Sequence, residues 1–499
     1  REIAISYELV SGKSTIFVNK NTDPFTCNDN MSCLLGENQN VTTIRVGGHN
    51  YDVGHILCTA GGGLAALASV CNNNIKACGA STLYTTTSVH VMLHELGHQY
   101  NANHTFSANS AGCAGNGNAA TAYESGSGVT IMSYSGSCAP NNVPSSGDEY
   151  YHVHSLLEMG NYIQGLTCGT ATPNIPILFI PNLKEVYHIP KNTPFELEGP
   201  EATVQGSQIP QKFYYNWEQY DMRFDLVEAA GSGEVTGPTL RSHNPSATTT
   251  QTYPNTNMII AGNYSDVGYR LPNVERDIHF KYTARGILNA KGAFNVIDSV
   301  VTIKVAGNSS DFRITSQNSG VANWNPGDQV TFNWTVGGTN NAPVNCGGVS
   351  IYLHYPDGSN TDFKLVAYAP NTGSYTYTIP NHNAVGAYIK IKGAGNIFFD
   401  VSKGRVNVNG TNSVNDVELN AAIELYPNPA TDVLNVTVNN SVQGNLDAEM
   451  FNVLGQKVWS GNIKNSATIK TEGFARGNYI LQVRDTKTGT STSKKVVLK

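Results

Sequence analysis

The sequence predicts a multidomain protein in which a mixed α/β domain is followed by all-β sandwich modules. Three observations support this prediction. The chain has 499 residues, more than the roughly 100–200 of a single domain. Eight of its nine cysteines and eight of its 13 histidines fall before residue 170. After residue 171 the helical period disappears, and short β-branched and aromatic runs alternate with Pro, Gly and Asn turns.

The first predicted domain begins with two strand-like segments, at 1–10 and 14–19. A glycine-rich bend at 61–63 follows and leads into a stretch rich in Ala and Leu. The next predicted element is a helix over 89–101. The chain opens without Met and without a signal-peptide pattern, so we expect either a removed N-terminal piece or a fragment.

The rest of the chain predicts three β units and one linker. Strand-like runs fit two sandwiches, and a polar stretch of Asn, Ser, Gly and Thr after them predicts a flexible linker. The predicted units are an α/β domain at 1–170, β-sandwich modules at 171–306 and 307–408, a linker at 409–420 and a small all-β unit at 421–499.

The charge pattern excludes two classes of partner. Charged residues make up only 14% of the chain, and the formal net charge is −6. No cluster of Lys and Arg stands out, so neither nucleic acid nor an anionic membrane surface is an expected partner. No run of about 18 apolar residues occurs, so we expect no transmembrane segment.

The cysteines of the first domain favour disulfides over a metal site. Their number is even, and the short spacings, Cys27 to Cys33 and Cys71 to Cys78, are not the Cys-x-x-Cys pairs of structural zinc sites. Disulfides persist in oxidising compartments. We therefore expect an exported domain.

The segment from His94 to His104 carries the chemistry. His94 and His98 are four residues apart on the predicted helix, so their rings lie on one face and can share a tetrahedral metal. Glu95 beside them can hold and deprotonate a metal-bound water. The helix must end before His104 can turn back as third ligand, and Asn101 at that point tolerates the left-handed conformation. Three neutral histidines and one open position indicate a hydrolytic site.

This pattern resembles the zinc-binding consensus of the metzincin metalloproteases, with Asn101 in place of the usual Gly. The resemblance implies that the three histidines bind zinc and that Glu95 is the general base. Metzincins also have a turn whose Met lies under the histidines, and Met132 in Thr-Ile-Met-Ser-Tyr matches it. Some branches carry a Tyr two residues later that binds zinc or stabilises the tetrahedral intermediate. Tyr134 has that spacing, although an ordinary packed tyrosine is the alternative.

Residues 1–170 more closely resemble the bacterial reprolysin-like (adamalysin-like) peptidases, through the segments 51–55, 61–65 and 103–106. Such domains begin with a strand and a long helix, and we expect this chain to enter at the second strand, which leaves the metzincin-type domain N-terminally incomplete. Disulfide connectivity does not follow from sequence alone. The resemblance implies Cys71–Cys168, and the other expected pairs are Cys113–Cys138, Cys27–Cys33 and Cys58–Cys78.

The last unit resembles the C-terminal sorting domain of type IX secretion. Its motifs are Tyr-Pro-Asn-Pro-Ala-Thr-Asp from 426, Asn-Val-Leu-Gly-Gln-Lys from 452, Gly-Asn-Tyr from 477 and a terminal Lys-Lys-Val. The resemblance implies the type IX machinery as partner and a secreted or surface-attached protein of a Gram-negative bacterium. A carbohydrate-binding β-sandwich is the alternative. The two middle modules look like the immunoglobulin- or fibronectin-like repeats that accompany such peptidases.

These observations predict a secreted zinc endopeptidase that cleaves extracellular proteins with a zinc-activated water and Glu95 as base. The alternative is a surface adhesin with an inactive or truncated metalloprotease-like domain. Whether calcium is a second cofactor is left open, since the sequence does not show a calcium site. Glu124 is a weaker candidate ligand than His104. We expect His55 to be structural rather than a ligand, and His90, His152 and His154 to be surface or packing residues.

Overall fold

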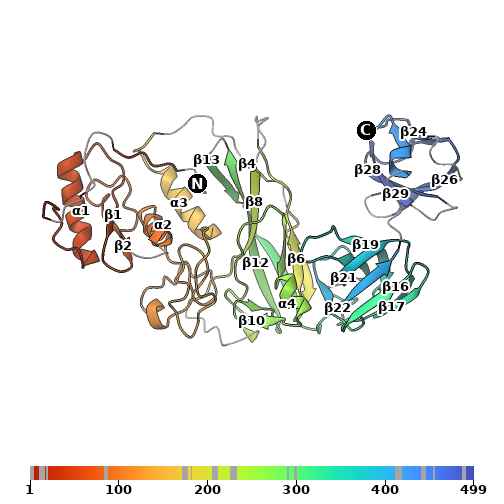
Figure 1. The fold of residues 1–499 in the computed structure, drawn as a ribbon, viewed down its shortest axis with the longest axis horizontal. Coiled ribbons are helices and arrows are strands. Elements are labelled where there is room, and N and C mark those ends of the chain that lie inside the picture. Colours follow the sequence, from red (N-terminus) through yellow and green to blue (C-terminus); the bar gives the residue numbers. More distant parts are fainter. Residues whose placement is uncertain are drawn as a thin grey trace.

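The computed structural model describes residues 5–10, 17, 21–83, 88–170, 178–180, 183–204, 212–224, 233–288, 291–296, 300–410, 419–439, 446–452, 456–485 and 491–499. Among them a mixed α/β domain is followed by units built mainly of β-strands, which confirms the predicted fold class. Figure 1 shows this domain at one end, two β units beside it and a third unit at the C-terminal end.

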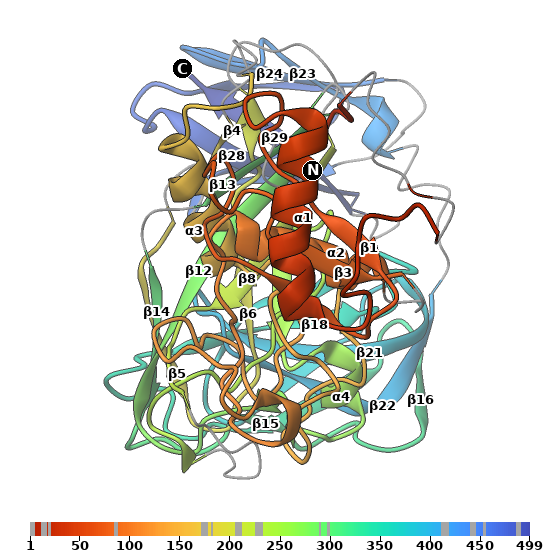
Figure 2. The same ribbon diagram turned by 90° about the vertical axis from the view of Figure 1, so that its left-hand side faces the viewer.

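The described elements of the N-terminal domain are helix α1 Met31–Val46, strands β1 Ile56–Cys58, β2 Gly63–Ala65 and β3 Gly79–Thr82, helix α2 Ser88–Gln99, a short 3₁₀ turn Ala111–Cys113 and helix α3 Val153–Gln164. The strand order is β1-β3-β2, with β1 parallel and β2 antiparallel to β3. Helix α2 packs on β2 and β3. Helix α1 lies at the end remote from the β units (Figures 1 and 2).

The sequence pattern does not predict helix α1. Its buried residues are Leu34, Asn38, Gln39 and Val46, so half of its buried face is amide. Asn38 Nδ2 donates to the Ala77 carbonyl at 2.6 Å, and Gln39 Oε1 accepts from the Ala77 N–H at 2.7 Å. Because hydrogen bonds replace an apolar stripe, no helical period marks this segment. Helix α1, 16 residues long, precedes the first described strand.

Of the two strands expected at the start of the chain, the one at 1–10 is wrong where the structure describes it. Of the one at 14–19 only residue 17 is described, so that strand stays a prediction. Residues 5–10 belong to no strand. Ile5 packs against an apolar core that contains Tyr100, and the ring of Tyr7 lies 6.5 Å from that of Tyr100. An alternating pattern predicts one buried face, but Leu9 of that face is 87% exposed, so the segment neither pairs to a sheet nor buries the whole face. Residues 1–4, 14–16, 18 and 19 of these two predicted strands lie outside the described residues.

Three of the four expected disulfides are confirmed: Cys27–Cys33, Cys71–Cys168 and Cys113–Cys138. The fourth pair is wrong, because Cys58 and Cys78 are both free thiols. In the parallel pairing of β1 with β3, Cys58 lies opposite Thr82, four residues beyond Cys78. At about 3.3 Å per residue this offset is about 13 Å, whereas the Cα atoms of a disulfide lie within about 7 Å.

The first β unit centres on a sheet of strand order β13-β12-β14-β5, in which β12 also pairs with β8. Three two-stranded pairs, β4-β7, β6-β9 and β10-β11, surround this sheet. The bounds are β4 Leu178–Phe179, β5 Val186–Pro190, β6 Phe195–Glu198, β7 Thr203–Val204, β8 Lys212–Gln219, β9 Thr250–Tyr253, α4 Thr256–Ile260, β10 Ser265–Asp266, β11 Tyr269–Arg270, β12 Arg276–Leu288, β13 Lys291–Val296 and β14 Val301–Ala306.

The second β unit has two sheets, of order β15-β17-β20 and β16-β22-β21-β18-β19. Its buried side chains form one continuous apolar cluster with those of the first β unit. At the junction Glu196 accepts from Lys390 Nζ at 2.6 Å and Lys392 Nζ at 2.7 Å. The bounds are β15 Arg313–Ile314, β16 Val321–Trp324, β17 Gln329–Thr335, β18 Gly348–His354, β19 Phe363–Pro370, β20 Ser374–Thr378, β21 Asn383–Gly393 and β22 Phe399–Asn409.

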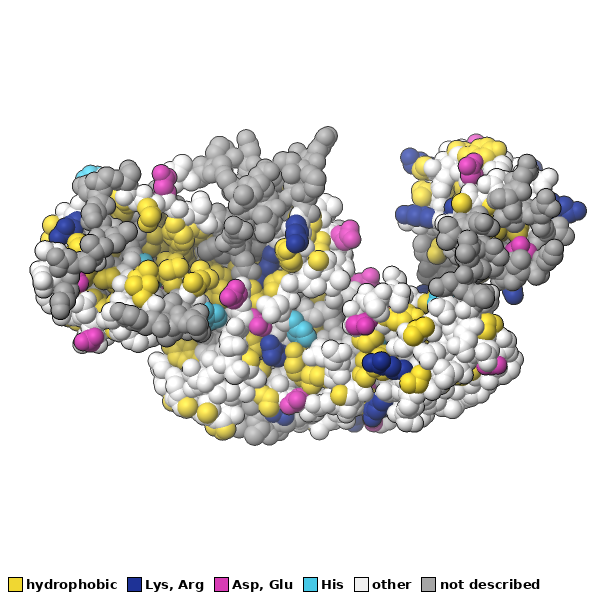
Figure 3. Space-filling model, in the orientation of Figure 1, with side chains coloured by type: hydrophobic (Ala, Val, Ile, Leu, Met, Phe, Trp, Pro, Cys, Tyr) yellow, Lys and Arg dark blue, Asp and Glu magenta, His cyan; other side chains and the backbone are white. Residues whose placement is uncertain are grey.

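The C-terminal unit has its own apolar core and two sheets, of order β23-β24-β27 and β26-β25-β28-β29. Most of the predicted linker, residues 411–418, lies outside the described residues. None of the described helices is long and apolar enough to span a bilayer. On the face shown in Figure 3, Lys and Arg side chains are dispersed. The bounds are β23 Ile423–Tyr426, β24 Val433–Val438, β25 Leu446–Asn452, β26 Lys457–Ile463, β27 Ser466–Lys470, β28 Gly477–Asp485 and β29 Ser491–Leu498.

Candidate active site

Three histidine rings meet beside helix α2. His94 and His98 lie one turn apart on this helix, and His104 follows it after a short loop. The helix ends as expected, because Asn101 has the left-handed φ of 75°. His104 Nε2 lies 3.1 Å from His94 Nε2 and 3.0 Å from His98 Nε2. The three side chains are therefore close enough to hold one metal ion.

A backbone carbonyl holds the opposite nitrogen, Nδ1, of each ring. The pairs are His94 with Ile131 (2.7 Å), His98 with Ala102 (2.7 Å) and His104 with Asn116 (2.5 Å). A carbonyl only accepts, so each Nδ1 carries the proton and each Nε2 presents a lone pair. Three converging lone pairs repel one another unless a cation lies between them. The set fits zinc, whose tetrahedral nitrogen ligands lie about 3.3 Å apart for bonds of about 2.0–2.1 Å.

The protein keeps all three imidazoles neutral. Burial lowers the pKa of His94 well below its usual range, and its two neighbouring histidines lower this pKa further. Burial also lowers the pKa of His98 to about 4 and depresses the pKa of His104. Neutral imidazole is the form that binds a metal ion, so the site is ready for one at neutral pH.

Glu95 lies beneath β2, at the edge of the described sheet. A methyl group added at Gly63 in β2 would overlap the Glu95 carboxyl group, so only glycine allows this close approach. Burial raises the pKa of Glu95 to about 8, and its Oε2 atom is buried without a hydrogen-bond partner. A buried oxygen of this kind is costly unless a ligand of the site pairs with it. A cation held by the histidines would lower this pKa and favour the carboxylate.

Met132 packs against the same helix. A methyl group added at Gly97 would overlap Met132 Sδ, so the turn touches α2 one residue before His98. Met132 is fully buried, and its carbonyl accepts from the Thr105 N–H at 3.2 Å, next to His104. Met132 thus takes the place that the resemblance implies for the turn methionine.

Tyr134 lies beside the histidines. Its ring centroid is 4.6 Å from that of His104 and 5.6 Å from that of His94. Burial and the nearby Glu95 raise the pKa of Tyr134, so its hydroxyl stays protonated at neutral pH. A protonated phenol in this position can donate a hydrogen bond to a developing oxyanion.

Glu124 is not part of the histidine cluster. It is buried and accepts from the Thr105 and Thr130 hydroxyls and from the backbone N–H groups of Val129 and Thr130. The carboxylate therefore ties the residue after His104 to the segment that leads into the Met turn. The sequence suggests Glu124 only as a metal ligand, because its hydrogen-bond partners are scattered along the chain and leave no local pattern.

Two further residues hold the backbone around His104. Glu158 of α3 accepts from the Asn103 N–H at 2.9 Å and from Asn103 Nδ2 at 2.7 Å. Thr121 Oγ1 donates to the His104 carbonyl at 2.6 Å. Neither Glu158 nor Thr121 was singled out from the sequence, since each partner lies far along the chain.

The other candidate histidines make contacts outside the cluster. His55 bonds Gln99 Oε1 at 3.0 Å and Ser81 Oγ at 2.8 Å. His154 Nδ1 lies 3.0 Å from the Tyr220 hydroxyl of the first β unit. His152 is buried 3.9 Å from Glu218, and the ring of His90 lies against Gly147.

Two family models match this chain. Residues 1–146 match the model of metallo-peptidase family M12. The N-terminal domain is an M12-type metallopeptidase domain. Residues 424–499 match the secretion system C-terminal sorting domain, which belongs to type IX secretion and indicates a protein that is secreted or attached to the cell surface. No curated protein matches the chain.

Solved structures resemble the chain only weakly. One is PorZ, a surface component of the type-IX secretion system of Porphyromonas gingivalis, at 14% identity, 45% of this chain, 29% of that chain and a TM-score of 0.15. Another comprises the chicken CNTN1 FN1–FN3 domains, at 9% identity, 65% of this chain, 98% of that chain and a TM-score of 0.12. The chain spans under a third of PorZ. TM-scores this low do not show a shared fold, so the immunoglobulin or fibronectin type of the middle units stays a prediction.

Proposed function

We propose that this protein is a secreted zinc endopeptidase that hydrolyses peptide bonds of extracellular proteins. One observation carries the proposal: three neutral Nε2 atoms converge next to a buried carboxyl group, Glu95, whose Oε2 has no partner among the described residues. His94, His98 and His104 would hold the zinc. Zinc, when bound, supplies a Lewis acid that polarises the substrate carbonyl and acidifies water. The M12 match over residues 1–146 supports the same reaction class.

Strand β2 offers a place for the substrate. One edge of β2 pairs with β3, and among the described strands its other edge is unpaired. An extended peptide can therefore add there as a further antiparallel strand. Glu95 lies directly beneath β2 at Gly63, so such a peptide passes beside the carboxylate and the histidines.

Glu95 acts as the general base in this proposal. Its carboxylate accepts a proton from the attacking water as the water oxygen bonds to the carbonyl carbon. The same proton passes to the leaving nitrogen as the C–N bond breaks. Tyr134 donates a hydrogen bond to the oxyanion formed between these two steps, and its raised pKa keeps the phenol protonated.

We propose that the remaining units serve export and support. The sorting domain would direct the chain to the type IX machinery, and the substrates would be proteins or peptides outside the cell. The proposed division is a peptidase domain at 1–170, β-sandwich modules at 171–306 and 307–408, a linker at 409–420 and the sorting domain at 421–499.

The substitution Glu95→Gln tests the proposal. It keeps the shape of the side chain and removes the base, so we expect one zinc per chain to be retained and casein hydrolysis to fall by about 10²–10⁴-fold. Glu149→Gln is the matched control, because Glu149 is an exposed carboxylate of the same domain outside the cluster. Zinc content and hydrolysis are measured on the three proteins side by side.

Equal hydrolysis by the wild type and Glu95→Gln contradicts the role of Glu95. Zinc bound at one equivalent without hydrolysis of casein or gelatin by the wild type contradicts the peptidase proposal and favours the adhesin alternative.

A further inference from the structure

The first β unit meets the N-terminal domain at a loop that orients the third histidine. We call residues 111–124 the ligand loop, and residues 220–224, which follow β8, the docking segment. The docking segment touches the ligand loop at three successive places. The contacts are Tyr220 with Tyr123 (ring centroids 4.4 Å apart), the Arg223 N–H with the Ala122 carbonyl (3.1 Å) and Phe224 with Gly117.

Phe224 reaches the ligand loop one residue from the group that holds His104. A methyl group added at Gly117 would overlap the ring edge of Phe224 and lie 3.2 Å from Phe106, so Gly117 is enclosed between two aromatic rings. Phe106 stacks on His104, with centroids 5.2 Å apart. The neighbour of Gly117 is Asn116, whose carbonyl accepts from His104 Nδ1 at 2.5 Å.

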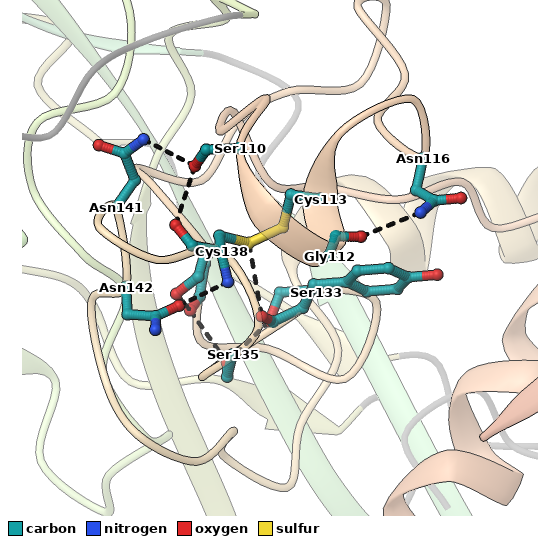
Figure 4. Close-up of a disulfide and its surroundings, with 12 residues drawn as sticks. Ser110, Gly112, Cys113, Asn116, Ser133, Ser135, Cys138, Asn141 and Asn142 are labelled. Carbon is teal, nitrogen blue, oxygen red and sulfur yellow. Dashed lines mark hydrogen bonds between the residues drawn. A yellow bond between two sulfur atoms is a disulfide. The ribbon is translucent and has the colours of Figure 1, made fainter. Parts of the chain in front are cut away.

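The ligand loop has little apolar core of its own. The buried residues beside it are Phe106, Ala108, Cys113 and Cys138, with Tyr134 packed against them. The disulfide of Cys113 with Cys138 anchors only its start, where Asn116 Nδ2 donates to the Gly112 carbonyl at 2.9 Å (Figure 4). Beyond Asn116 the docking segment contacts the loop, and the Thr121 hydroxyl and the Glu124 carboxyl tie its last part to the chain around His104.

We propose that Phe224 of the first β unit is a positioning residue for the metal site: it holds Gly117 in place, so that the Asn116 carbonyl keeps the ring of His104 aimed at the metal. The inference rests on the zinc site proposed above. It goes beyond that site, because a residue of the first β unit then sets the zinc affinity of the peptidase domain. Partners of metal-bound histidines in other sites change metal affinity by about 10–100-fold when they are removed.

The test compares zinc affinity in full-length variants, measured by competition with a fluorescent chelator. For Phe224→Ala we expect the zinc dissociation constant to rise by about 10–100-fold. Phe224→Leu keeps an apolar side chain at this point and should raise it less. Met222→Ala is the matched control, because Met222 lies two residues away in the docking segment and is 46% exposed. Melting of the zinc-free proteins shows whether each variant is folded.

A second substitution acts from the other side of the contact. Gly117→Ala places a methyl group where the ring edge of Phe224 lies, so we expect weaker zinc binding from this change as well. In the double variant Gly117→Ala with Phe224→Leu the overlap is relieved, and we expect affinity to recover partly. This pair decides the question even if Phe224→Ala does not fold.

Wild-type zinc affinity in folded Phe224→Ala overturns the inference. So does an unchanged affinity in Gly117→Ala, or a loss in the double variant equal to the sum of the two single losses. The assay contains no substrate, so a wild type that binds zinc but cleaves nothing contradicts only the proposed function. A wild type that binds no zinc contradicts both.

Discussion

The two halves of the N-terminal domain hold the candidate metal site in different ways. The first half, residues 31–99, supplies two histidines and the carboxylate from α2, a regular helix packed on a sheet. The second half, residues 103–152, supplies His104 and Tyr134 from chain in which the described regular structure is one short 3₁₀ turn. We call them the sheet half and the loop half.

This difference shows where each half gets its rigidity. In the sheet half, backbone hydrogen bonds within α2 fix the spacing of the ligands. In the loop half, the third histidine depends on a buried carboxylate, a disulfide and a segment of the neighbouring β unit. Substitutions far from the histidines should therefore matter more in the loop half than in the sheet half.

The largest expected effect follows from Glu124→Ala. This change leaves two hydroxyls and two backbone N–H groups without their buried acceptor, so we expect a loss of about 3–5 kcal/mol in the free energy of unfolding. Glu124→Gln keeps one acceptor and should cost less. Urea unfolding of the N-terminal domain measures both values, and a loss below about 1 kcal/mol for Glu124→Ala would show that the loop half is self-supporting.

The next effect concerns the disulfide of the loop half. Replacing Cys113 and Cys138 by Ser opens a loop with a sequence separation of 25, which costs about 3.5 kcal/mol in the chain-entropy account. The control is the pair Cys27 and Cys33, whose separation of 6 gives about 2 kcal/mol. Urea unfolding under non-reducing conditions should rank the two variants in this order. If the Cys27 and Cys33 variant loses more stability than the Cys113 and Cys138 variant, the loop half does not depend on its disulfide more than the rest of the domain does.

A third effect is pH-dependent and lies where α3 meets the first β unit. Burial lowers the pKa of His152 to about 3, and Arg285 contributes to this shift. The unfolded value is about 6.5, so His152 stabilises the fold fully above that pH, and this stability is lost as the pH falls toward the folded pKa. At pH 4 the loss reaches about 3 kcal/mol.

The variant His152→Asn isolates the contribution of His152 to the pH dependence of stability. Asn keeps an acceptor for the His154 N–H that His152 caps at the start of α3, but it does not titrate. Melting temperatures between pH 7 and pH 4 should fall less steeply in His152→Asn than in the wild type. If the melting temperatures of the two proteins fall in parallel with pH, His152 does not cause the acid sensitivity.

The smallest effect is expected on a regular sheet surface. Asp277 and Lys304 face each other across β12 and β14 at 2.8 Å, and both side chains are nearly half exposed. Solvent screens such a pair, so Asp277→Asn should change the unfolding free energy by no more than about 0.5–1 kcal/mol. A larger loss in urea unfolding would mean that regular sheets also depend on single polar contacts.

The sequence predicted those features that local spacing encodes. The four-residue step from His94 to His98 and the helix end at Asn101 depend on the geometry of one helix, and the structure has both. The all-β units follow from alternation and turn residues in the same way. Three disulfides were also predicted, by resemblance and pairing of the remaining cysteines.

The features that the sequence did not predict depend on contacts between distant segments. Helix α1 is buried through the amides of Asn38 and Gln39, so it lacks an apolar period. The pairing of Cys58 with Cys78 failed because the register of two parallel strands separates them. The contact of Phe224 with Gly117 joins two domains, and no pattern within either segment marks it.

Zinc K-edge X-ray absorption on the zinc-loaded full-length protein would identify the atoms that bind the metal. We expect three imidazole nitrogens and one further light atom at about 2.0–2.1 Å, with the same three-imidazole pattern in Glu95→Gln. Sulfur at about 2.3 Å would place the zinc on a cysteine such as Cys58 or Cys78, and it would contradict the three-histidine site.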